Sequence, residues 1–580
     1  MKTLKQFLFI LSKKNKLDAF FLFLFILLSV FLEMIGIGLI IPILTTLSDS
    51  SGGAQNNLFD FNSIFNFLGY EQLFSKEKVI SLSVIFLTLI YLIKTIFLNF
   101  LAWFQSKYIN SLVAQLKFNL FKKYMYQDYT FHLQRNSSKL IQNIVNEIEL
   151  MINVFFLSLI TFTSELFVVF GISIILIFIE PLGFIMSMIL FGITSIIFFF
   201  YTKKKVKRYG EKRLTNETLS IKNLQQGIDG IKAIKVAGVE NNFLNYFNLN
   251  VNKIASVASS MLILQTIPRY YLEFLAVISL TGLIFFLLFL NYTFNSLLVI
   301  VGLFAAAAFK ILPSVNRILS SFVNMRYGLA SVDVVYNDLK LDSSLNNIRN
   351  NTREKLSFKS QIKLQNIDFK YPNTNKLILK NLNLTIDANS TIGIVGKSGS
   401  GKTTLVDLII GILSPNSGKI FVDDKEILKS MRAWQNNVGY IPQFIYLLDD
   451  TIKVNVALSG ITKNIDDSLI HRAINLSNLT DFIKKLPMGV ETKVGEFGVR
   501  LSGGQKQRIG IARALYNEHD LLVFDEATSS LDEETEKEII KTINSMKRKK
   551  TIIICSHKKE ILEKCDKIYR VENQIIKMIN

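Results

Sequence analysis

The chain is poor in the residues that cross-link a fold, interrupt its helices or bind metals. Among its 580 residues are only 2 Cys, 8 Pro and 4 His. Two cysteines, Cys555 and Cys565, exclude a disulfide-stapled secreted domain, and the shortage of Cys and His leaves a redox or metal-cluster function without support. The low proline content, together with a 50% share of hydrophobic residues, excludes a disordered or collagen-like protein.

Long apolar runs are abundant, but only in the N-terminal part. Six runs are long enough to cross a membrane, at about 19–47, 79–106, 151–179, 182–201, 270–290 and 294–312. The first run is too long for a cleaved signal peptide, so it is predicted to be a transmembrane helix. We therefore expect a transmembrane domain over 1–340, a polar linker over 341–355 and a soluble domain over 356–580.

Of the formal net charge of +20, the larger part lies in residues 1–340, which hold 30 basic and 18 acidic residues, and the basic residues there gather in two places. Basic residues precede the first span and fill 203–213, between the fourth and fifth spans, whereas the short turns between the other spans lack them. This asymmetry predicts that both termini face the cytoplasm. It explains the charge better than nucleic-acid binding does, so no nucleic acid is expected as a partner.

The connections after spans two and four are long, polar and free of proline, which predicts that the helices extend into the cytoplasm. Short breaks at 127–132 and 227–232 are candidate coupling loops that dock on the soluble domain; ordinary helical turns are the alternative. The Phe-rich segment 58–74 predicts a short external helix on the membrane surface, with a loop packed on the helix tops as the alternative.

Charged residues also occur inside the apolar runs, where each is costly unless it faces a partner or water. One interpretation is a basic cavity that receives a phosphate or pyrophosphate; the other is that these charges pair with one another. The cations are Lys94, Arg269 and Lys310, with Arg317 just beyond, and the anions are Glu33, Glu165 and Glu273.

In the soluble half, the buried-strand pattern 391–395 leads directly into a glycine-rich loop and an apolar helix. This is the context of a phosphate-binding loop, whose backbone N–H groups curl around phosphates. Lys402 would reach the β and γ phosphates, and the Thr403 hydroxyl would hold Mg²⁺. The loop is Gly396, Lys397, Ser398, Gly399, Ser400, Gly401, Lys402, Thr403 and Thr404.

A second apolar strand, 521–524, ends in Asp525 and Glu526. If it lies beside the first strand, Asp525 falls on the metal side and Glu526 where a hydrolytic water would sit.

The pentapeptide Leu501, Ser502, Gly503, Gly504, Gln505 stands just before a helix, between the phosphate-binding loop and the Asp-Glu strand. It resembles the signature of ABC transporter ATPases. The resemblance covers the whole chain, since six spans fused ahead of one nucleotide-binding domain resemble an ABC exporter half-transporter of type IV. It implies an α/β P-loop ABC domain that hydrolyses ATP to drive transport.

The resemblance also implies roles for single residues. Tyr371 resembles the aromatic that stacks on adenine, Gln443 the Q-loop residue at Mg²⁺, and His557 the switch histidine at the γ-phosphate. Asp532 ends a segment, 530–532, that resembles the D-loop. Segment 494–498 resembles the exporter-specific segment that meets the coupling helices, and Ser530 and Lys558 are small departures from the commoner Ala and Arg.

Two phosphate sites in one chain imply a dimer. The helix that starts after Ser502 offers a second set of free N–H groups, so two such sites can enclose one ATP only across two subunits. A homodimer that binds two ATP and Mg²⁺ is the simplest assembly, and a heterodimer remains open.

Within exporters, the finer resemblance is to bacterial flippases of lipid-linked oligosaccharides, carried by segments 33–38 with Pro42, 268–273 and 312–317. It implies that a polyprenyl-pyrophosphate glycan moves from the cytoplasmic to the outer leaflet of the bacterial inner membrane, with the pyrophosphate held by Lys94, Arg269 and Lys310. The alternatives are an exporter of peptides, lipids or drugs, and a gated channel or regulatory membrane ATPase. The intact Glu526 argues against the channel.

Overall fold

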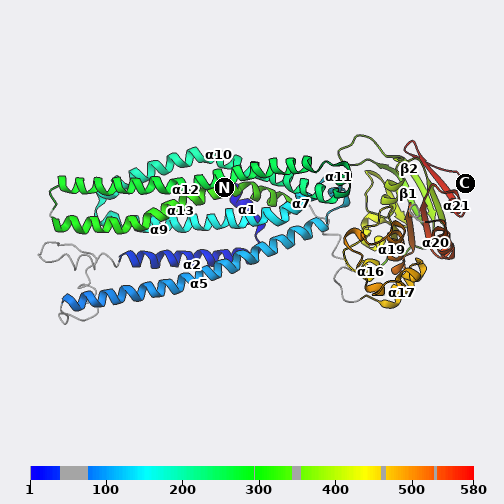
Figure 1. The fold of residues 1–580 in the computed structure, drawn as a ribbon, viewed down its shortest axis with the longest axis horizontal. Coiled ribbons are helices and arrows are strands. Elements are labelled where there is room, and N and C mark those ends of the chain that lie inside the picture. The colour runs from blue at the N-terminus through cyan, green and yellow to red at the C-terminus, as the bar shows by residue number, and fades with distance from the viewer. Residues whose placement is uncertain are drawn as a thin grey trace. The chain divides into compact units, whose positions relative to one another are not determined.

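The structure is a computed structural model that describes residues 2–38, 76–292, 294–341, 354–458, 465–527 and 532–579. It divides into two compact units, drawn in Figure 1. The first comprises Met1–Met125 and Arg135–Asp342, and the second comprises Tyr126–Gln134 and Ser343–Asn580. The predicted external helix 58–74, Pro42, and Ser530 and Leu531 of the D-loop-like segment lie outside the described residues.

Unit 1 is built from helices that run side by side (Figure 1). Among the described residues, six helical segments are long and apolar enough to cross a membrane, which confirms the predicted six-helix membrane domain. The helices of this unit are α1 (Lys2–Ile10), α2 (Lys13–Gly38), α5 (Lys76–Met125), α7 (Ser137–Gln142), α8 (Ile148–Leu150), α9 (Leu157–Ile179), α10 (Pro181–Asp229), α11 (Ile231–Ala237), α12 (Glu240–Phe289) and α13 (Phe294–Lys340), with π-helical turns at Asn143–Glu147 and Met151–Phe156.

The long helices continue well past the apolar spans. At 1.5 Å per residue, the 50 residues of α5 extend about 75 Å, more than twice the roughly 30 Å of a hydrocarbon core. No proline interrupts the polar parts of α5 and α10, so the helical hydrogen bonds continue beyond the membrane. The predicted extensions are therefore present.

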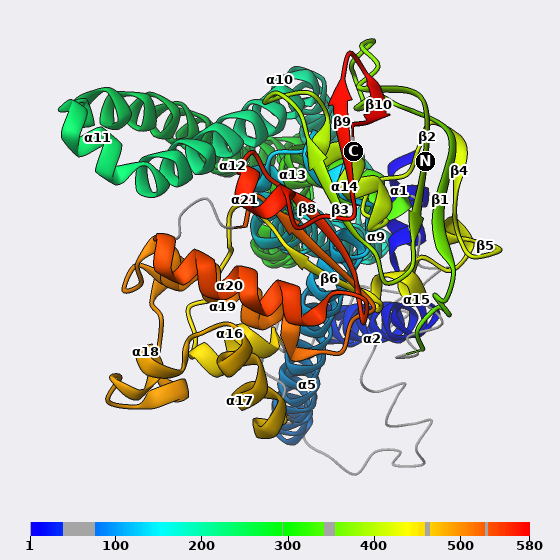
Figure 2. The same ribbon diagram turned by 90° about the vertical axis from the view of Figure 1, so that its right-hand side faces the viewer.

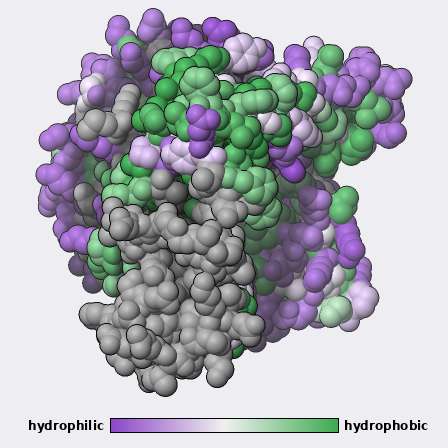
Figure 3. Space-filling model, turned by 90° about the vertical axis from the view of Figure 1, so that its left-hand side faces the viewer, coloured by the Kyte–Doolittle hydropathy of each residue, from purple (hydrophilic) through white to green (hydrophobic). Residues whose placement is uncertain are grey.

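The surface of unit 1 suits a lipid environment. Figure 3 looks at the end of this unit and shows hydrophobic side chains gathered on the face. Phe285 and Phe289 near the end of α12 and Phe294 at the start of α13 are all strongly exposed. A soluble protein rarely exposes so many large apolar side chains together, whereas a membrane surrounds them with hydrocarbon.

The helices approach closely where glycine allows it. A Cβ added to Gly210 on α10 would lie 2.4 Å from the Tyr327 carbonyl oxygen on α13, and one added to Gly328 would lie 2.8 Å from the Phe155 side chain. Only a residue without a side chain fits these contacts.

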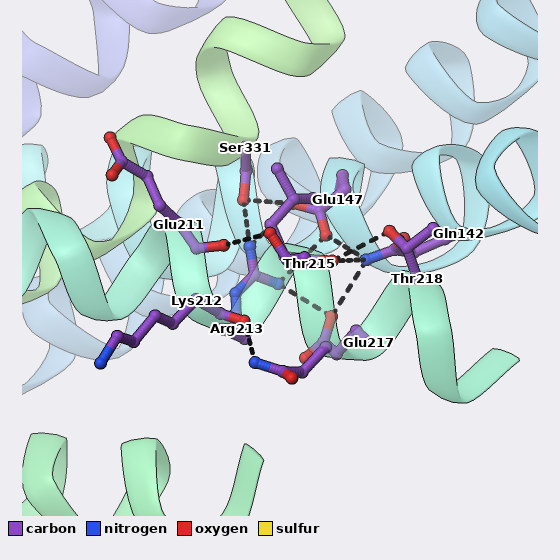
Figure 4. A network of polar contacts seen from close by, with 11 residues as sticks. Gln142, Glu147, Glu211, Lys212, Arg213, Thr215, Glu217, Thr218 and Ser331 are labelled. Atoms are coloured by element: carbon purple, nitrogen blue, oxygen red, sulfur yellow. Dashed lines mark hydrogen bonds and ion pairs between the residues drawn. The ribbon is translucent and has the colours of Figure 1, made fainter. Parts of the chain in front are cut away.

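A buried polar network ties α10, the first π-helical turn and α13 together (Figure 4). The Arg213 guanidinium donates to both carboxylate oxygens of Glu147, at 3.1 and 2.8 Å, and Ser331 donates to Glu147 at 2.6 Å. The side chains of Arg213 and Glu147 are 3% and 0% exposed. This bidentate pair is thus buried away from solvent, and both carboxylate oxygens of Glu147 accept hydrogen bonds.

Unit 2 is an α/β domain with two sheets, as Figure 2 shows, and its helices α16 to α20 gather on one side of the strands. A six-stranded sheet has the order β10-β9-β3-β8-β7-β6 and is parallel except for β10, and a four-stranded antiparallel sheet has the order β2-β1-β4-β5. The strands are β1 (Gln361–Phe369), β2 (Leu379–Asp387), β3 (Thr391–Val395), β4 (Ser417–Val422), β5 (Lys425–Glu426), β6 (Val438–Ile441), β7 (Leu521–Asp525), β8 (Thr551–Cys555), β9 (Lys567–Glu572) and β10 (Ile575–Met578). The helices are α6 (Tyr129–Gln134), α14 (Lys402–Ile409), α15 (Met431–Gln435), α16 (Ile452–Ala457), α17 (Asp467–Leu476), α18 (Thr480–Lys484), α19 (Gly503–Tyr516), α20 (Glu533–Met546) and α21 (Lys559–Leu562).

The core strands of the parallel sheet are continuous apolar runs, and every residue of β7 and β8 is buried. Such runs are typical of strands covered on both faces. Because β3, β8, β7 and β6 are neighbours and parallel, their carboxyl ends meet at one edge of the sheet.

Candidate nucleotide and substrate sites

The glycine-rich loop between β3 and α14 has the backbone of an anion-binding loop. Gly399 and Gly401 have φ angles of 77° and 104°, which other residues rarely adopt. A Cβ on Gly396 would lie 2.5 Å from the Val571 carbonyl oxygen, so glycine is required there as well. The last residues of the loop, from Lys402 onward, form the first turn of α14, where the N–H groups and the helix dipole favour phosphate. The residues therefore fit a nucleotide's phosphates.

Four predicted site residues converge beside this loop. The buried Lys402 Nζ donates to the Gly396 carbonyl at 2.7 Å, and it lies 3.2 Å from His557 Nε2 and 3.9 Å from Glu526. Gln443 Nε2 donates to Glu526 at 2.8 Å, and His557 Nε2 lies 3.5 Å from the same carboxylate. These side chains come from α14 and from the ends of β6, β7 and β8, as the sheet order requires.

Glu526 itself has a strained backbone. Its φ angle is 50°, in the left-handed region that an L-residue enters at a cost of roughly 1–3 kcal/mol. Its N–H donates to the Cys555 carbonyl at 3.0 Å, which fixes this conformation against β8. Strain of this kind clusters at active sites, where a side chain must take one particular direction.

Asp525 is a buried carboxylate at the end of β7, and burial raises its pKa while a hydrogen bond from Thr403 lowers it. The buried Asp407 lies nearby; burial, together with the charge of Asp525, raises its pKa to about 6. The described residues contain no cluster of three or more His, Cys, Asp or Glu that would hold a metal alone. An oxygen set made of Asp525, Thr403 and Gln443 instead suits Mg²⁺ held jointly with a nucleotide.

Tyr371 lies close to the loop, at the start of the segment that follows β1. Its hydroxyl is 3.0 Å from the Thr404 hydroxyl, and its ring meets Phe369 edge-on with centroids 5.1 Å apart. The structure thus places this ring near the start of α14. Its stacking on adenine stays a prediction.

The signature segment forms the N-terminus of α19. The Ser502 side chain accepts from the Gln505 N–H at 3.2 Å, and the Gln505 side chain accepts from the Ser502 N–H at 2.9 Å, which is a capping box. Gly503 and Gly504 are the first residues of α19, so their N–H groups lie in the first turn, where a helix has no acceptors of its own for them. Asp532 caps α20 in the same way, accepting from the Thr535 N–H at 3.1 Å. Neither Ser502 nor Asp532 joins the Lys402 and Glu526 cluster in the described part of this single chain.

In the membrane unit, two of the three predicted cavity cations meet. Lys94 on α5 lies 3.7 Å from Oε1 of Glu33 on α2, and Lys310 on α13 forms an ion pair with the same oxygen. Arg269 does not join them; it pairs with Glu273 one turn along α12 at 2.8 Å, and its side chain is 69% exposed. Arg317 pairs with Glu165 at 2.6 Å. In the structure these charges therefore pair with one another, as the alternative interpretation expected.

A separate pocket of about 490 Å³ lies between α9, α10, α12 and α13. Its walls are almost entirely apolar, with Leu176, Phe184 and Leu280 among them, and two of its few polar groups, Ser187 and Ser279, bond to each other at 2.8 Å. Nothing in the sequence pattern singled it out, because its lining comes from four helices.

Comparison with known proteins agrees with both halves of this architecture. The sequence model of the family "ABC transporter transmembrane region" matches residues 19–310, and that of the family "ABC transporter" matches residues 379–529. The chain belongs to the ABC transporter family. With one membrane region and one ATP-binding region it is a half-transporter of the exporter type, and it couples ATP hydrolysis to transport across a membrane.

Its relatives include ABC transporter proteins and lipid A-core flippases. An uncharacterised ABC transporter ATP-binding protein, y4gM, of Sinorhizobium fredii is 28% identical over 506 residues, 86% of this chain and 84% of that protein. The ATP-dependent lipid A-core flippase of Wigglesworthia glossinidia brevipalpis is 28% identical over 486 residues, 82% and 80% of the two chains. That of Saccharophagus degradans is 31% identical over 353 residues, 60% and 58%.

The same architecture occurs in the solved structure of a bacterial Atm1-family ABC exporter with ATP bound. The superposition covers 97% of this transporter and 94% of the Atm1-family chain, with a TM-score of 0.77 at 20% sequence identity. At that identity the likeness concerns the fold, and it confirms the predicted exporter architecture.

Proposed function

We propose that this transporter flips an anionic glycolipid, a polyprenyl-pyrophosphate-linked oligosaccharide, from the cytoplasmic to the outer leaflet. One observation carries the proposal: Lys94 and Lys310 share the single carboxylate of Glu33, which leaves an excess positive charge inside the membrane unit. Such a charge is costly unless it serves a bound anion or a polar path. Relatives named ATP-dependent lipid A-core flippase support a lipid that carries sugars as the cargo.

In this proposal each residue of the nucleotide site has a role. The loop Gly396–Thr404 and Lys402 bind the phosphates of ATP, Tyr371 stacks on its adenine, and Thr403, Asp525 and Gln443 hold Mg²⁺. Bound there, Mg²⁺ would neutralise charge that develops on the phosphates. Glu526 accepts the proton of the attacking water, and His557 donates to the γ-phosphate. The hydrogen bond from Gln443 to Glu526 orients the base.

The proposed assembly is a homodimer. The free N–H groups at Gly503 and Gly504, beside Ser502, and the Asp532 segment would complete the nucleotide site of the partner subunit, because neither joins the Lys402 cluster of its own chain. A heterodimer with a second half-transporter is distinguished by purification, since the chain expressed alone would then fail to hydrolyse ATP.

The proposed setting is the bacterial inner membrane with both termini in the cytoplasm, as the basic residues at 203–213 predict. The candidate coupling loops lie at 127–132 and 227–232. Two observations support them: Tyr126–Gln134 groups with the nucleotide-binding unit, and Gly230 separates α10 from α11. Cross-linking α6 to the nucleotide-binding domain through paired cysteines would test the first loop.

Translocation by the purified protein in liposomes tests the function. A fluorescent polyprenyl-pyrophosphate glycan, a lipid A-type glycolipid, an amphipathic peptide and a cationic dye are compared with ATP and with the Glu526→Gln variant as control. Glycan movement that requires ATP and Glu526 is the expected result. If only the lipid A-type glycolipid moves, that lipid replaces the polyprenyl-linked glycan as the proposed cargo. If only the peptide or the dye moves, the argument that Lys94 and Lys310 select an anionic cargo is refuted. ATP hydrolysis without any movement would favour a channel or regulatory ATPase.

A further inference from the structure

The pocket between α9, α10, α12 and α13 lies at the depth of the hydrocarbon core of the membrane. Its lining residues belong to the apolar spans 151–179, 182–201, 270–290 and 294–312, with Val315 just beyond the last of them. Lipid tails rather than water therefore surround this part of the unit. The volume of about 490 Å³ is of the size that holds one small ligand.

The few polar groups of the pocket already have hydrogen-bond partners. The polar side chains in its described lining are serines. The hydroxyls of Ser173 and Ser195 each donate to the backbone carbonyl one helical turn earlier, at 2.7 Å. Ser187 donates to the Gly183 carbonyl at 2.9 Å, so in its 2.8 Å contact with Ser279 the Ser279 hydroxyl is the donor. The described lining thus has no hydroxyl proton left to donate to a ligand.

This chemistry argues against water or a peptide as the occupant. A buried water needs about two to four polar partners, and a peptide backbone needs a partner for each N–H and C=O group. A helical peptide is also too large, since a single turn of helix with its side chains takes up roughly 500 Å³. A hydrocarbon chain needs no hydrogen bonds, and it gives dispersion contacts to walls that would otherwise face empty space.

The pocket extends from the surface of the unit into its interior. Met188, Val277 and Phe309, which lie on three different helices of the lining, are strongly exposed. Leu176 and Phe304 belong to the same lining but are almost fully buried. A chain that enters from the surface can therefore contact residues inside the helix bundle.

We propose that this pocket binds a hydrocarbon chain of a bilayer phospholipid, whose head group stays outside the bundle. A phospholipid is the source because phospholipids make up most of the bilayer around the unit, and the lining offers nothing to a phosphate or a sugar. The bound chain contacts all four helices and stabilises their packing, because it fills a cavity between them. Lys94 and Lys310 are not among the lining residues, so this site is separate from the proposed cargo site and does not depend on the proposed function.

Two glycines provide a variant that fills the pocket and a matched control. Gly192 lines the pocket on α10, and a Cβ added there meets no atom within 4 Å. Gly282 on α12 has equally open surroundings but is not among the lining residues. Gly192→Trp should therefore place its indole in the space that the chain needs, whereas Gly282→Trp adds the same side chain elsewhere in the unit.

The test is photolabelling of the full-length transporter in nanodiscs of phosphatidylglycerol with a diazirine in the middle of one acyl chain. Mass spectrometry locates the label. In the unmodified protein and in Gly282→Trp we expect label at the buried wall residues Leu176 and Phe304. In Gly192→Trp this label should fall about tenfold, because the indole excludes the chain. Phe285, which is exposed and lies outside the lining, should be labelled equally in all three proteins.

Three results would overturn the proposal. One is label at Phe285 but none at Leu176 and Phe304, and another is equal label at these wall residues in Gly192→Trp and Gly282→Trp. The third is label at the wall only from a polyprenyl phosphate that carries the diazirine in its tail, which would assign the pocket to an isoprenoid lipid. Should Gly192→Trp not fold, Gly192→Leu replaces it; a partial loss of wall label supports the proposal, and an unchanged label overturns it.

A second copy of the chain is the other candidate occupant, through a side chain inserted from the partner subunit. In that case the wall of the unmodified protein stays unlabelled, and Gly192→Trp lowers the dimer fraction measured by mass photometry while Gly282→Trp does not. This combination would also overturn the proposal. Wall label that is lost in Gly192→Trp while the dimer fraction stays unchanged supports the phospholipid chain.

Discussion

Replacing Arg213 by Met should be among the most destabilising single changes in the membrane unit. The substitution removes both hydrogen bonds from the guanidinium to Glu147, at 3.1 and 2.8 Å, and leaves that carboxylate buried with only the Ser331 hydroxyl and Gln142 amide as donors. Breaking a buried pair by removing one partner costs about 3–5 kcal/mol, because the remaining charge is no longer compensated.

The same helix offers a matched control. Lys207 pairs with Glu211 at 3.7 Å on the surface of α10, where the two side chains are 58% and 56% exposed. Lys207→Met should cost no more than about 0.5 kcal/mol. The double variant Arg213→Met with Glu147→Gln should recover part of the stability lost in the single variant, since the orphaned charge is removed.

Thermal unfolding of the detergent-purified protein, scanned at one heating rate, measures these differences as a rank order of midpoints. We expect Arg213→Met to unfold at the lowest temperature and the double variant at a higher one. Lys207→Met should unfold at the same temperature as the unmodified protein. The reasoning is refuted if Arg213→Met and Lys207→Met unfold at the same temperature, or if adding Glu147→Gln lowers the midpoint further.

Four other predictions concern the sites. Lys402→Ala should weaken ATP binding itself, measured with a fluorescent nucleotide, because the loop loses its ammonium group; normal affinity would contradict the phosphate role. Glu526→Gln should bind ATP but hydrolyse it about a hundredfold or more slowly and accumulate as an ATP-bound dimer; normal turnover would exclude Glu526 as the base. Lys94→Gln with Lys310→Gln should abolish movement of the pyrophosphate lipid in liposomes, and full transport would remove these lysines from the substrate path. Asp407→Asn should stabilise the protein against unfolding more at pH 8 than at pH 5. The folded-state pKa of Asp407 is about 6, above the usual 3.8, so ionisation of this carboxyl destabilises the fold as the pH rises through this window. An effect on stability that does not change with pH would contradict the raised pKa.

The nucleotide site was largely predictable because its signals are local. A glycine-rich loop after one buried strand and an Asp-Glu pair after another mark the carboxyl ends of these two strands as the candidate site. Because β3, β8 and β7 are parallel neighbours, these ends meet at one edge of the sheet. The contact between Gln443 and Glu526 follows from the same rule, because β6 is the neighbour of β7.

The membrane unit was predictable only in outline. Apolar runs give the six spans, and the missing prolines indicate that the helices continue beyond them. The partners of Glu33 are not readable, because they depend on how α2, α5 and α13 are rotated about their axes, and one sequence does not determine this. The Arg213 and Glu147 pair joins residues 66 positions apart for the same reason.

The length of α5 has a mechanical consequence. A continuous helix of 50 residues acts as a lever arm about 75 Å long, so a tilt of about 5° at one end displaces the other end by roughly 6–7 Å. That displacement exceeds one helical turn, although no hydrogen bond within the helix needs to break. The stiffness of this helix, rather than any single contact along it, therefore sets how much of a movement at one end of α5 reaches the other end.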